Sequence, residues 1–147
     1  MLHPIGIVRT RAICNEVRDK SHLSEIHLDP DLLPALEGVR EFSHIFVLFW
    51  LHQISDAERR KMKIHPRGRK DMPLVGVFAA RSKYRPNPIG LTLCELVSVE
   101  DTVLTVRGLD AFDGTYVLDL KPYDSWDCAP DAKVPQWWMK LERERTH

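Results

Sequence analysis

The chain has 147 residues, of which 44% are apolar and 29% are charged. This length and balance predict one globular domain and exclude a chain that is disordered throughout. Basic and acidic residues number 21 each, so net charge does not by itself indicate a nucleic-acid partner. We expect one domain over residues 1–147, with a core at about 3–123 and a tail at 124–147.

The first third of the chain predicts strands separated by polar connections. Ile5–Arg9 and Ser24–Leu28 have the composition of short strands, and Pro34–Glu41 predicts a turn of helix. His44–Leu51 is apolar without alternation, which favours a strand buried on both faces over a short buried helix. We expect its aromatic residues to belong to the core: Phe46, Phe49 and Trp50.

A long basic connection, His52–Pro73, comes next, and long loops of this kind are usually functional or disordered. Val75–Ala80 predicts a strand. Arg81–Gly90 contains two prolines, which exclude a helix interior or a central strand. Leu91–Glu100 and Val103–Gly108 predict two strands joined as a hairpin.

The last third begins with Asp113-Gly114, a strong signal for a tight turn, followed by a predicted strand at Thr115–Leu120. Pro135–Arg145 predicts a helix with proline at its first position. Adjacent tryptophans cannot share one helix face, so we expect one of Trp137 and Trp138 to dock on the barrel and the other to be exposed. The predicted fold is mostly β: a single β-barrel of short strands with a long basic insertion loop and a short C-terminal helix.

Positive charge is concentrated in one part of the chain. Between Ala57 and Arg85 there are ten basic residues and two acidic ones. Such a patch can attract phosphate groups on a neutral protein, and the alternative is a solvated surface loop. The basic residues are Arg59, Arg60, Lys61, Lys63, Arg67, Arg69, Lys70, Arg81, Lys83 and Arg85.

The cysteines and histidines predict neither a disulfide framework nor a metal site. The three cysteines form no CxxC pair and the seven histidines no ligand spacing. We therefore expect a reduced compartment and a cytoplasmic protein. The N-terminus does not resemble a signal peptide, and the longest apolar run, 45–51, is too short to cross a membrane.

Several classes of enzyme site are absent from the sequence. The seven glycines are isolated, which excludes a glycine-rich dinucleotide fingerprint or phosphate-binding loop. The sequence also lacks GxSxG and HExxH, so hydrolysis by those sites has no support.

Four segments of the chain carry motifs that belong together. One runs from Gly76–Ser82 through Arg85-Pro86-Asn87-Pro88-Ile89-Gly90-Leu91, and the part that begins at Arg81-Ser82 is the most specific. The others are Pro4–Thr10, Leu36-Glu37-Gly38 with Phe42–His44 and His52-Gln53, and Leu109-Asp110 with Asp113-Gly114-Thr115 and Asp119–Tyr123. Together these segments resemble the TsaA-like, or TrmO, family of tRNA methyltransferases. The family's further C-terminal domain is not expected in this chain, which ends at His147.

The resemblance implies a β-barrel homodimer that binds S-adenosylmethionine near the dimer interface. It implies methyl transfer to N6 of N6-threonylcarbamoyladenosine next to the tRNA anticodon. The cofactor contacts it implies are Arg18, His52, Gln53, Arg81, Leu91, Asp113, Gly114, Thr115 and Tyr116. We expect substrate contacts at Tyr84, Arg85, Asn87, Lys121 and Tyr123, and no metal.

The residue types suit this chemistry, and each also has a plainer explanation. Methyl transfer from a sulfonium depends on alignment in a dry site, and the cation favours a carboxylate or an aromatic face such as Asp113 and Tyr116. Arg81 and Arg85 can bind a carboxylate or phosphate through paired bonds. Asp-Gly is also an ordinary hairpin turn, and a basic loop is often only solvated.

The sequence names no general base, and Asp119 and Tyr123 are weak candidates for that role. Two other functions stay open. One is a non-catalytic RNA- or nucleotide-binding barrel. The other is a methyltransferase with a small-molecule or protein acceptor.

Overall fold

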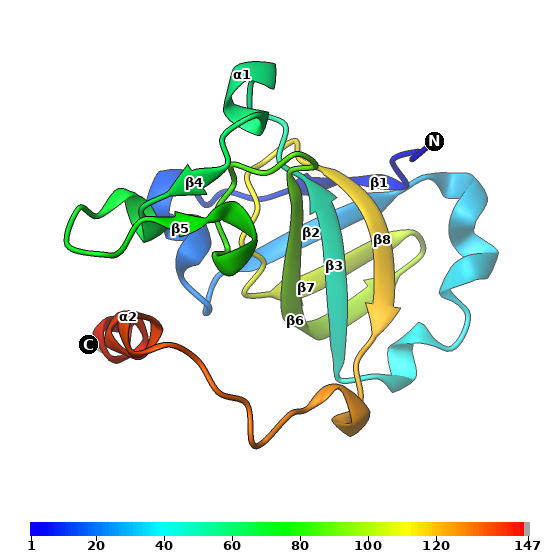
Figure 1. Cartoon of the computed structure of the whole chain (residues 1–147). Helices are drawn as coiled ribbons and strands as arrows, with labels where there is room; N and C mark the ends of the chain where they lie inside the picture. Colours follow the sequence, from blue (N-terminus) through cyan, green and yellow to red (C-terminus); the bar gives the residue numbers. More distant parts are fainter. Residues whose placement is uncertain (146–147) are drawn as a thin grey trace.

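The computed structural model describes residues 1–145, and six of its strands close into an antiparallel barrel (Figure 1). Their order around the barrel is β1-β2-β7-β6-β3-β8. The strands are β1 Gly6–Arg9, β2 Leu23–Leu28, β3 His44–Trp50, β6 Ile89–Glu100, β7 Val103–Arg107 and β8 Tyr116–Pro122. The predicted β-barrel is confirmed, because β1 pairs with both β2 and β8 and leaves no open edge strand.

The core fills the barrel through the inward side chain of every second residue. In β3 these are Ile45, Val47 and Phe49, which are almost fully buried. The alternate residues, including Phe46 and Trp50, point outward and are half-buried in the single chain. The prediction of a strand buried on both faces, with all three aromatics in the core, is therefore wrong for this chain, because the closed barrel covers only one face of the strand.

β6 changes partners along its length and thereby bends the barrel. Its first half, Ile89–Glu95, pairs with β3, and its second half, Glu95–Glu100, pairs with β7. The pairing shifts register between Leu96 and Ser98, and such irregularities bend a strand. The predicted hairpin to β7 is confirmed, and Asp101 in its turn has a positive φ of 51°.

Residues 52–88 connect β3 to β6 and form an insertion lobe at one end of the barrel (Figure 1). The lobe has its own elements: α1 Asp56–Arg59, β4 Lys63–Ile64 and β5 Val75–Gly76, with 3₁₀ turns at Pro66–Gly68 and Val77–Ala79. Val75–Ala80 is thus a strand only as far as Gly76, because β4 offers only two residues for pairing. A small apolar cluster of Ile64, Val77 and Ala80 holds the lobe together.

The connections between β1, β2 and β3 are 3₁₀ helices. They span Cys14–Arg18, Pro30–Leu36 and Val39–Glu41. The helical turn predicted at Pro34–Glu41 therefore exists as parts of two 3₁₀ segments, separated by Gly38 with a φ of 85°.

The C-terminal helix, α2 Gln136–Arg145, was predicted but does not dock where expected. Its ion pairs are with the insertion lobe: Glu144 pairs with Arg69, and Lys140 lies 3.3 Å from Asp71. Figure 1 shows α2 next to β4 and β5 and away from the barrel strands.

The two tryptophans of α2 were expected to differ in exposure, and this prediction is wrong. Trp137 and Trp138 are both half-buried, with ring centroids 5.5 Å apart, while Leu141 is buried. The two rings contact each other, and each is therefore partly shielded from solvent. No helix among residues 1–145 is long and apolar enough to cross a membrane.

Candidate functional site

One end of the barrel gathers most of the predicted cofactor contacts, and we call it the site end. The antiparallel pairing places the C-terminal ends of β1 and β3 beside the N-terminal ends of β6 and β8. The connections that leave these ends carry His52-Gln53 after β3, Arg81 before β6 and Asp113–Thr115 before β8. The topology thus brings together residues that are up to about 60 positions apart in the sequence.

The Asp113-Gly114 turn is joined by three hydrogen bonds to β1 and to Thr10, the residue that follows β1. The Asp113 carboxylate accepts a bond from Thr10 N at 3.1 Å. Gly114 N donates to Val8 O at 2.8 Å, and Val8 N donates to Thr115 O at 2.9 Å. Thr115 N closes the turn on Phe112 O at 3.2 Å, and Gly114 takes the left-handed φ of 82° that favours glycine. Asp113 and Tyr116 stay exposed at the surface while Thr115 is buried.

Arg81 lies against the first half of β6. Its guanidinium Nη2 donates to Leu91 O at 3.0 Å, on a stretch of β6 that pairs only with β3. The proline loop is joined to the barrel next to it, since Leu51 N donates to Pro88 O at 2.8 Å. Arg81 is exposed, so its remaining N–H groups are available to an anionic ligand.

Arg85 and Tyr84, both predicted to contact substrate, are engaged within the lobe. Arg85 Nη1 donates to three carbonyl oxygens of its own loop: Val77, Ala80 and Ser82, at 3.0, 2.7 and 3.4 Å. Tyr84 packs against the lobe's apolar cluster, and Lys61 Nζ lies 4.1 Å from its ring centroid. The Arg85 guanidinium thus organises the loop, whatever further contact it makes with a substrate.

The remaining predicted residues near this end differ in their surroundings. His52, Gln53 and Asn87 are exposed. Arg18 ends the 3₁₀ helix Cys14–Arg18, and its charge acts on Arg67 of the lobe, where burial and the charges of Arg145 and Arg18 lower the pKa of the guanidinium. Arg18 therefore lies beside the lobe.

Two predicted substrate contacts lie at the opposite end of the barrel. Lys121 is five residues along β8 from Tyr116, or about 17 Å at the usual rise of a strand. Tyr123 N bonds to His44 O at the start of β3, and its ring packs on Phe46. Asp119 pairs with Lys121 at 3.1 Å and accepts a bond from Leu120 N. Within one chain the structure does not bring Lys121, Tyr123 or Asp119 to the site end.

Comparison with known proteins identifies the family. The profile of the tRNA-methyltransferase O N-terminal domain matches residues 13–128, which is most of the chain. The chain belongs to this family. The resemblance inferred from the four motifs is confirmed.

Relatives of the TrmO family differ in length. A protein of Methanothermobacter thermautotrophicus named probable S-adenosyl-L-methionine-binding protein is 46% identical over 83% of this chain and 88% of its own length. The mouse tRNA (adenine(37)-N6)-methyltransferase is 40% identical over 95% of this chain and 32% of its own. A crystal structure of TrmO from Pseudomonas aeruginosa superposes with a TM-score of 0.73 at 31% identity, over 92% of this chain and 62% of that one. This chain therefore spans less than two thirds of the mouse protein and of the solved TrmO.

Three further residues of this TrmO-family domain lie on or beside the connections at the site end, and none of them is among the predicted site residues. Thr10 supplies the N–H that holds Asp113, and its position at the end of a matched motif was the available signal. Arg59 donates to Pro86 O at 2.8 Å and lies over the Trp50 ring at 5.4 Å, which ties the proline loop to β3. Phe78 is 79% exposed beside the guanidinium of Arg85. Arg59 belongs to the basic cluster of the sequence and Phe78 to a segment that resembles the family, but neither pattern indicated these contacts.

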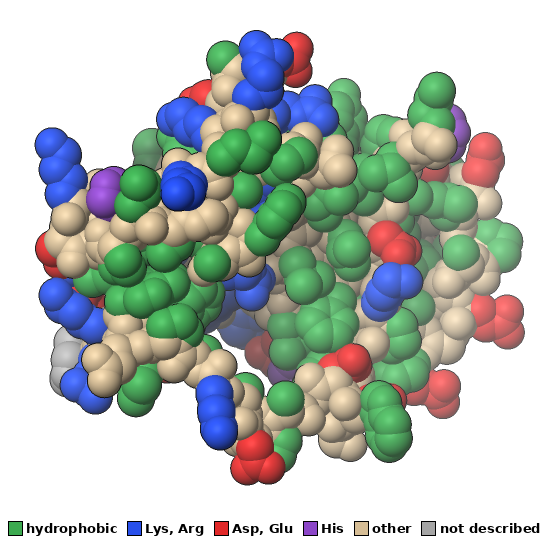
Figure 2. Space-filling view, viewed as in Figure 1, with side chains coloured by type: hydrophobic (Ala, Val, Ile, Leu, Met, Phe, Trp, Pro, Cys, Tyr) green, Lys and Arg blue, Asp and Glu red, His purple; other side chains and the backbone are tan. Residues whose placement is uncertain are grey.

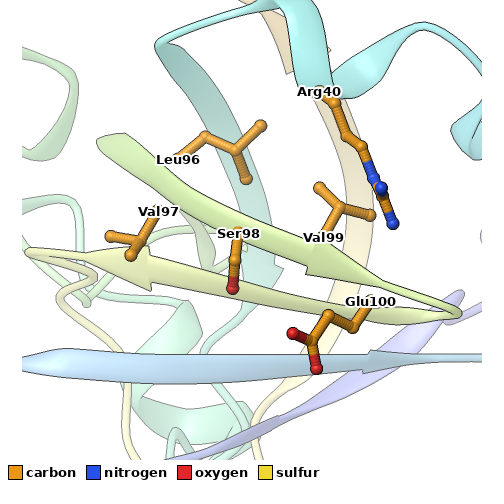
Figure 3. Close-up of a pocket in the computed structure, with 6 residues that line it drawn as sticks. All are labelled: Arg40, Leu96, Val97, Ser98, Val99 and Glu100. Atoms are coloured by element: carbon orange, nitrogen blue, oxygen red, sulfur yellow. The ribbon is translucent and has the colours of Figure 1, made fainter.

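Figure 2 shows a hollow beside β6, between the barrel and the part of the surface formed by the lobe and α2, with Lys or Arg side chains inside it. A separate pocket of about 320 Å³ lies far from this end, between Arg40 and the second half of β6. Figure 3 shows Leu96 and Val99 on one side of β6 and the other three β6 side chains on the opposite side, so they face no common centre. We therefore assign no site to that pocket.

The outer surface of β3 and β6 is apolar. Three directly opposed pairs cover it: Phe46 with Leu93, Leu48 with Leu91, and Trp50 with Ile89. Figure 2 shows apolar side chains gathered over these strands. An antiparallel sheet that faces water normally alternates apolar and polar residues, so this face, which we call the apolar face, is typical of an interface.

The side chains at the site end suit a ligand that carries a negative group and a positive group. Arg81 offers a guanidinium, Asp113 a carboxylate and Tyr116 an aromatic ring, while Leu91 adds apolar surface. Among residues 1–145, no group of three or more potential ligands is placed to hold a metal ion.

Proposed function

We propose that this domain is an S-adenosylmethionine-dependent methyltransferase that modifies a tRNA adenosine. The observation that carries the proposal is the site end, where two connections and the start of β8 present charged and aromatic groups around the ends of β3, β6 and β8. The β3–β6 connection presents the guanidinium of Arg81, the β7–β8 connection the carboxylate of Asp113, and the start of β8 the ring of Tyr116. The names of its TrmO-family relatives support both the cofactor and the RNA.

The residues of the site end fit this cofactor by their chemistry. S-adenosylmethionine supplies an electrophilic methyl group on a sulfonium cation, together with an amino-acid carboxylate. Arg81 would hold a carboxylate through its free N–H groups. Asp113 and Tyr116 would favour positive charge, the first by its carboxylate and the second by its ring face. Leu91 would exclude water from the reacting atoms.

The acceptor we propose is N6 of N6-threonylcarbamoyladenosine beside the anticodon. The mouse relative's name, which specifies N6 of adenine 37 in tRNA, supports this choice. The protein's task in such a transfer is to align acceptor and donor, and this requires no covalent enzyme intermediate. The threonyl carboxylate of the acceptor is a further anionic group for the basic side chains around the hollow.

We propose a homodimer formed through the apolar face. Its side chains are exposed in one chain to the extent of 36% for Ile89, 45% for Leu91 and 40% for Leu93. Burying such a face is favourable by roughly 25 cal/mol per Å² of apolar surface. A two-fold axis that crosses the strands would lay the site end of one protomer near the opposite end of its partner, where Lys121 and Tyr123 lie.

Light scattering of the purified protein tests the dimer. Leu93→Asp introduces a charge into the apolar face and should give a monomer, because a buried unpaired carboxylate is costly. Leu33→Asp is the matched control, since Leu33 is 49% exposed in the Pro30–Leu36 helix, outside the apolar face. A wild-type monomer, or a dimer that survives Leu93→Asp, would overturn this part of the proposal.

We propose a cytoplasmic location, as the sequence suggests. The support is that all three cysteines are unpaired thiols, which a reducing compartment maintains.

Nucleoside mass spectrometry tests the function directly. tRNA carrying threonylcarbamoyladenosine, incubated with protein and cofactor, should gain one methyl group on that nucleoside. Calorimetry should show that Arg81→Ala weakens cofactor binding while Arg40→Ala, at the far pocket, does not. tRNA binding without methyl gain would favour a non-catalytic RNA-binding barrel, and turnover indifferent to RNase would favour a different acceptor.

A further inference from the structure

The basic residues of the insertion lobe fall into two groups according to their partners. Four of its six arginines are bonded to the protein itself. Arg59 and Arg81 donate to backbone carbonyls, Arg85 donates to three, and Arg69 pairs with Asp71 and Glu144. The bonds of Arg59, Arg69 and Arg85 stabilise the lobe, and Arg81 is bonded to β6 and keeps its other N–H groups for a ligand.

The four lysines of the lobe are different. All are exposed, and none makes an ion pair or hydrogen bond within residues 1–145. They are Lys61, Lys63, Lys70 and Lys83. Unpaired ammonium groups on a surface are strongly hydrated point charges that are free to meet an external anion.

Two of these lysines are held together by one aromatic ring. Lys61 Nζ lies 4.1 Å and Lys83 Nζ 5.3 Å from the centroid of Tyr84. The nearby Glu58 carboxylate accepts bonds from the Ser55 N–H and hydroxyl, which lower the pKa of Glu58, and the lysine charges add to that effect. Glu58 is thus engaged with its helix cap and leaves both ammonium groups unpaired.

The ring that positions the lysines is itself fixed. Tyr84 is half-buried against Ile64, Val77 and Ala80, and its N–H donates to Ser82 Oγ at 3.1 Å. The hydrogen bonds from Arg85 to carbonyl oxygens of the same loop further restrict the position of the Tyr84 ring. Binding an anion at this place therefore costs less side-chain entropy than binding at freely rotating lysines.

We propose that Lys61 and Lys83 form a phosphate-binding pair for the backbone of the RNA substrate, separate from the cofactor site. The inference rests on the proposed function, which makes RNA the substrate. Support comes from the position of the lobe, whose two ends join β3 and β6 at the site end. An RNA that presents a nucleotide to the hollow must extend past this lobe. In this proposal the ring of Tyr84 positions the two ammonium groups, and the predicted substrate contact at Tyr84 is made through these lysines.

The salt dependence of tRNA binding tests this pair. Each phosphate contact contributes about 0.7 to the slope of log K against log salt for single strands and about 0.9 for duplexes. The double variant Lys61→Gln/Lys83→Gln should therefore lower the slope by about 1.4 to 1.8. The control Lys133→Gln/Arg40→Gln also removes two exposed charges, outside the lobe, and should leave the slope unchanged.

The same variants separate this inference from the proposed function. Cofactor binding by calorimetry should be equal in wild type and Lys61→Gln/Lys83→Gln, which also shows that the variant is folded. An unchanged slope, or an equal loss in the control, would overturn the phosphate pair even if methyl transfer is found. If the slope falls as expected in the double variant but the wild-type protein transfers no methyl group, the proposed methyltransferase activity is refuted and the phosphate-binding pair is retained. Binding to phosphatidylserine vesicles in place of tRNA would assign the lysines to a membrane and overturn the proposal.

Discussion

Gly90 is the position where a single methyl group should disturb the site end most. It lies directly opposite Phe49 in the β6–β3 pairing. A Cβ added at Gly90 would lie 2.2 Å from Phe49 Cε2 and 2.3 Å from Cζ. Ordinary contacts between carbon atoms are about 3.5 Å long, so both separations are too short by roughly 1 Å. The ring has little room to move away, because Phe49 is 3% exposed in the core.

We expect Gly90→Ala to destabilise the protein by about 3 kcal/mol. Overpacking a core costs about 1–3 kcal/mol, and expelling a phenylalanine ring costs about 3–5 kcal/mol. For a domain of this size the melting temperature should fall by roughly 6–12 °C. Thermal and urea unfolding followed by circular dichroism measure both quantities. Gly76→Ala is the control, because Gly76 also lies in a strand but its added Cβ would have Met62 O, 4.0 Å away, as its nearest neighbour.

A double-mutant cycle decides whether the clash is the cause. In Gly90→Ala/Phe49→Leu the smaller side chain leaves space for the methyl group. The double variant should therefore be more stable than the sum of the two single effects by about 1–3 kcal/mol. Strict additivity, or a Gly90→Ala protein within about 0.5 kcal/mol of wild type, would show that β3 and β6 separate here at little cost and would refute the reasoning.

Other predictions concern cysteine reactivity, acid stability and the turn before β8. Burial raises the pKa of Cys94 to about 12, so at pH 8 a maleimide should label the two exposed cysteines and reach Cys94 only after unfolding; rapid labelling of all three would contradict this. Hydrogen bonds from Arg69 lower the pKa values of Asp71 and Glu144, so their contribution to α2 docking is present above the ordinary carboxyl pKa of about 4 and is lost as the pH falls through the depressed values. Protease cleavage of α2 should therefore increase only below about pH 4, and release of the helix between pH 5 and 7 would show that other groups hold it. Gly114→Ala would place a side chain at φ 82° with no neighbour within 4 Å; it should cost about 1–2 kcal/mol in urea unfolding through backbone strain alone, and a neutral effect would mean that the turn adopts another conformation.

The sequence alone determined where most strands begin and end, because alternation and turn residues act over a few neighbours. The Asp113-Gly114 turn, the β6–β7 hairpin and the α2 helix all followed from such local patterns. The family was likewise recognisable, since the residues of its motifs are contiguous in short segments.

Only the tertiary structure decided which of these residues meet. Sequence could not show that Lys121 and Tyr123 lie at the far end of the barrel, because that depends on the direction of β8 between β1 and β3. The sequence also could not predict the partners of the charged side chains. Arg85 binds carbonyl oxygens of its own loop, while Lys61 and Lys83 both lie at the ring of Tyr84. The sequence shows which residues are charged, but the partner of each charge depends on how segments that are distant along the chain pack together.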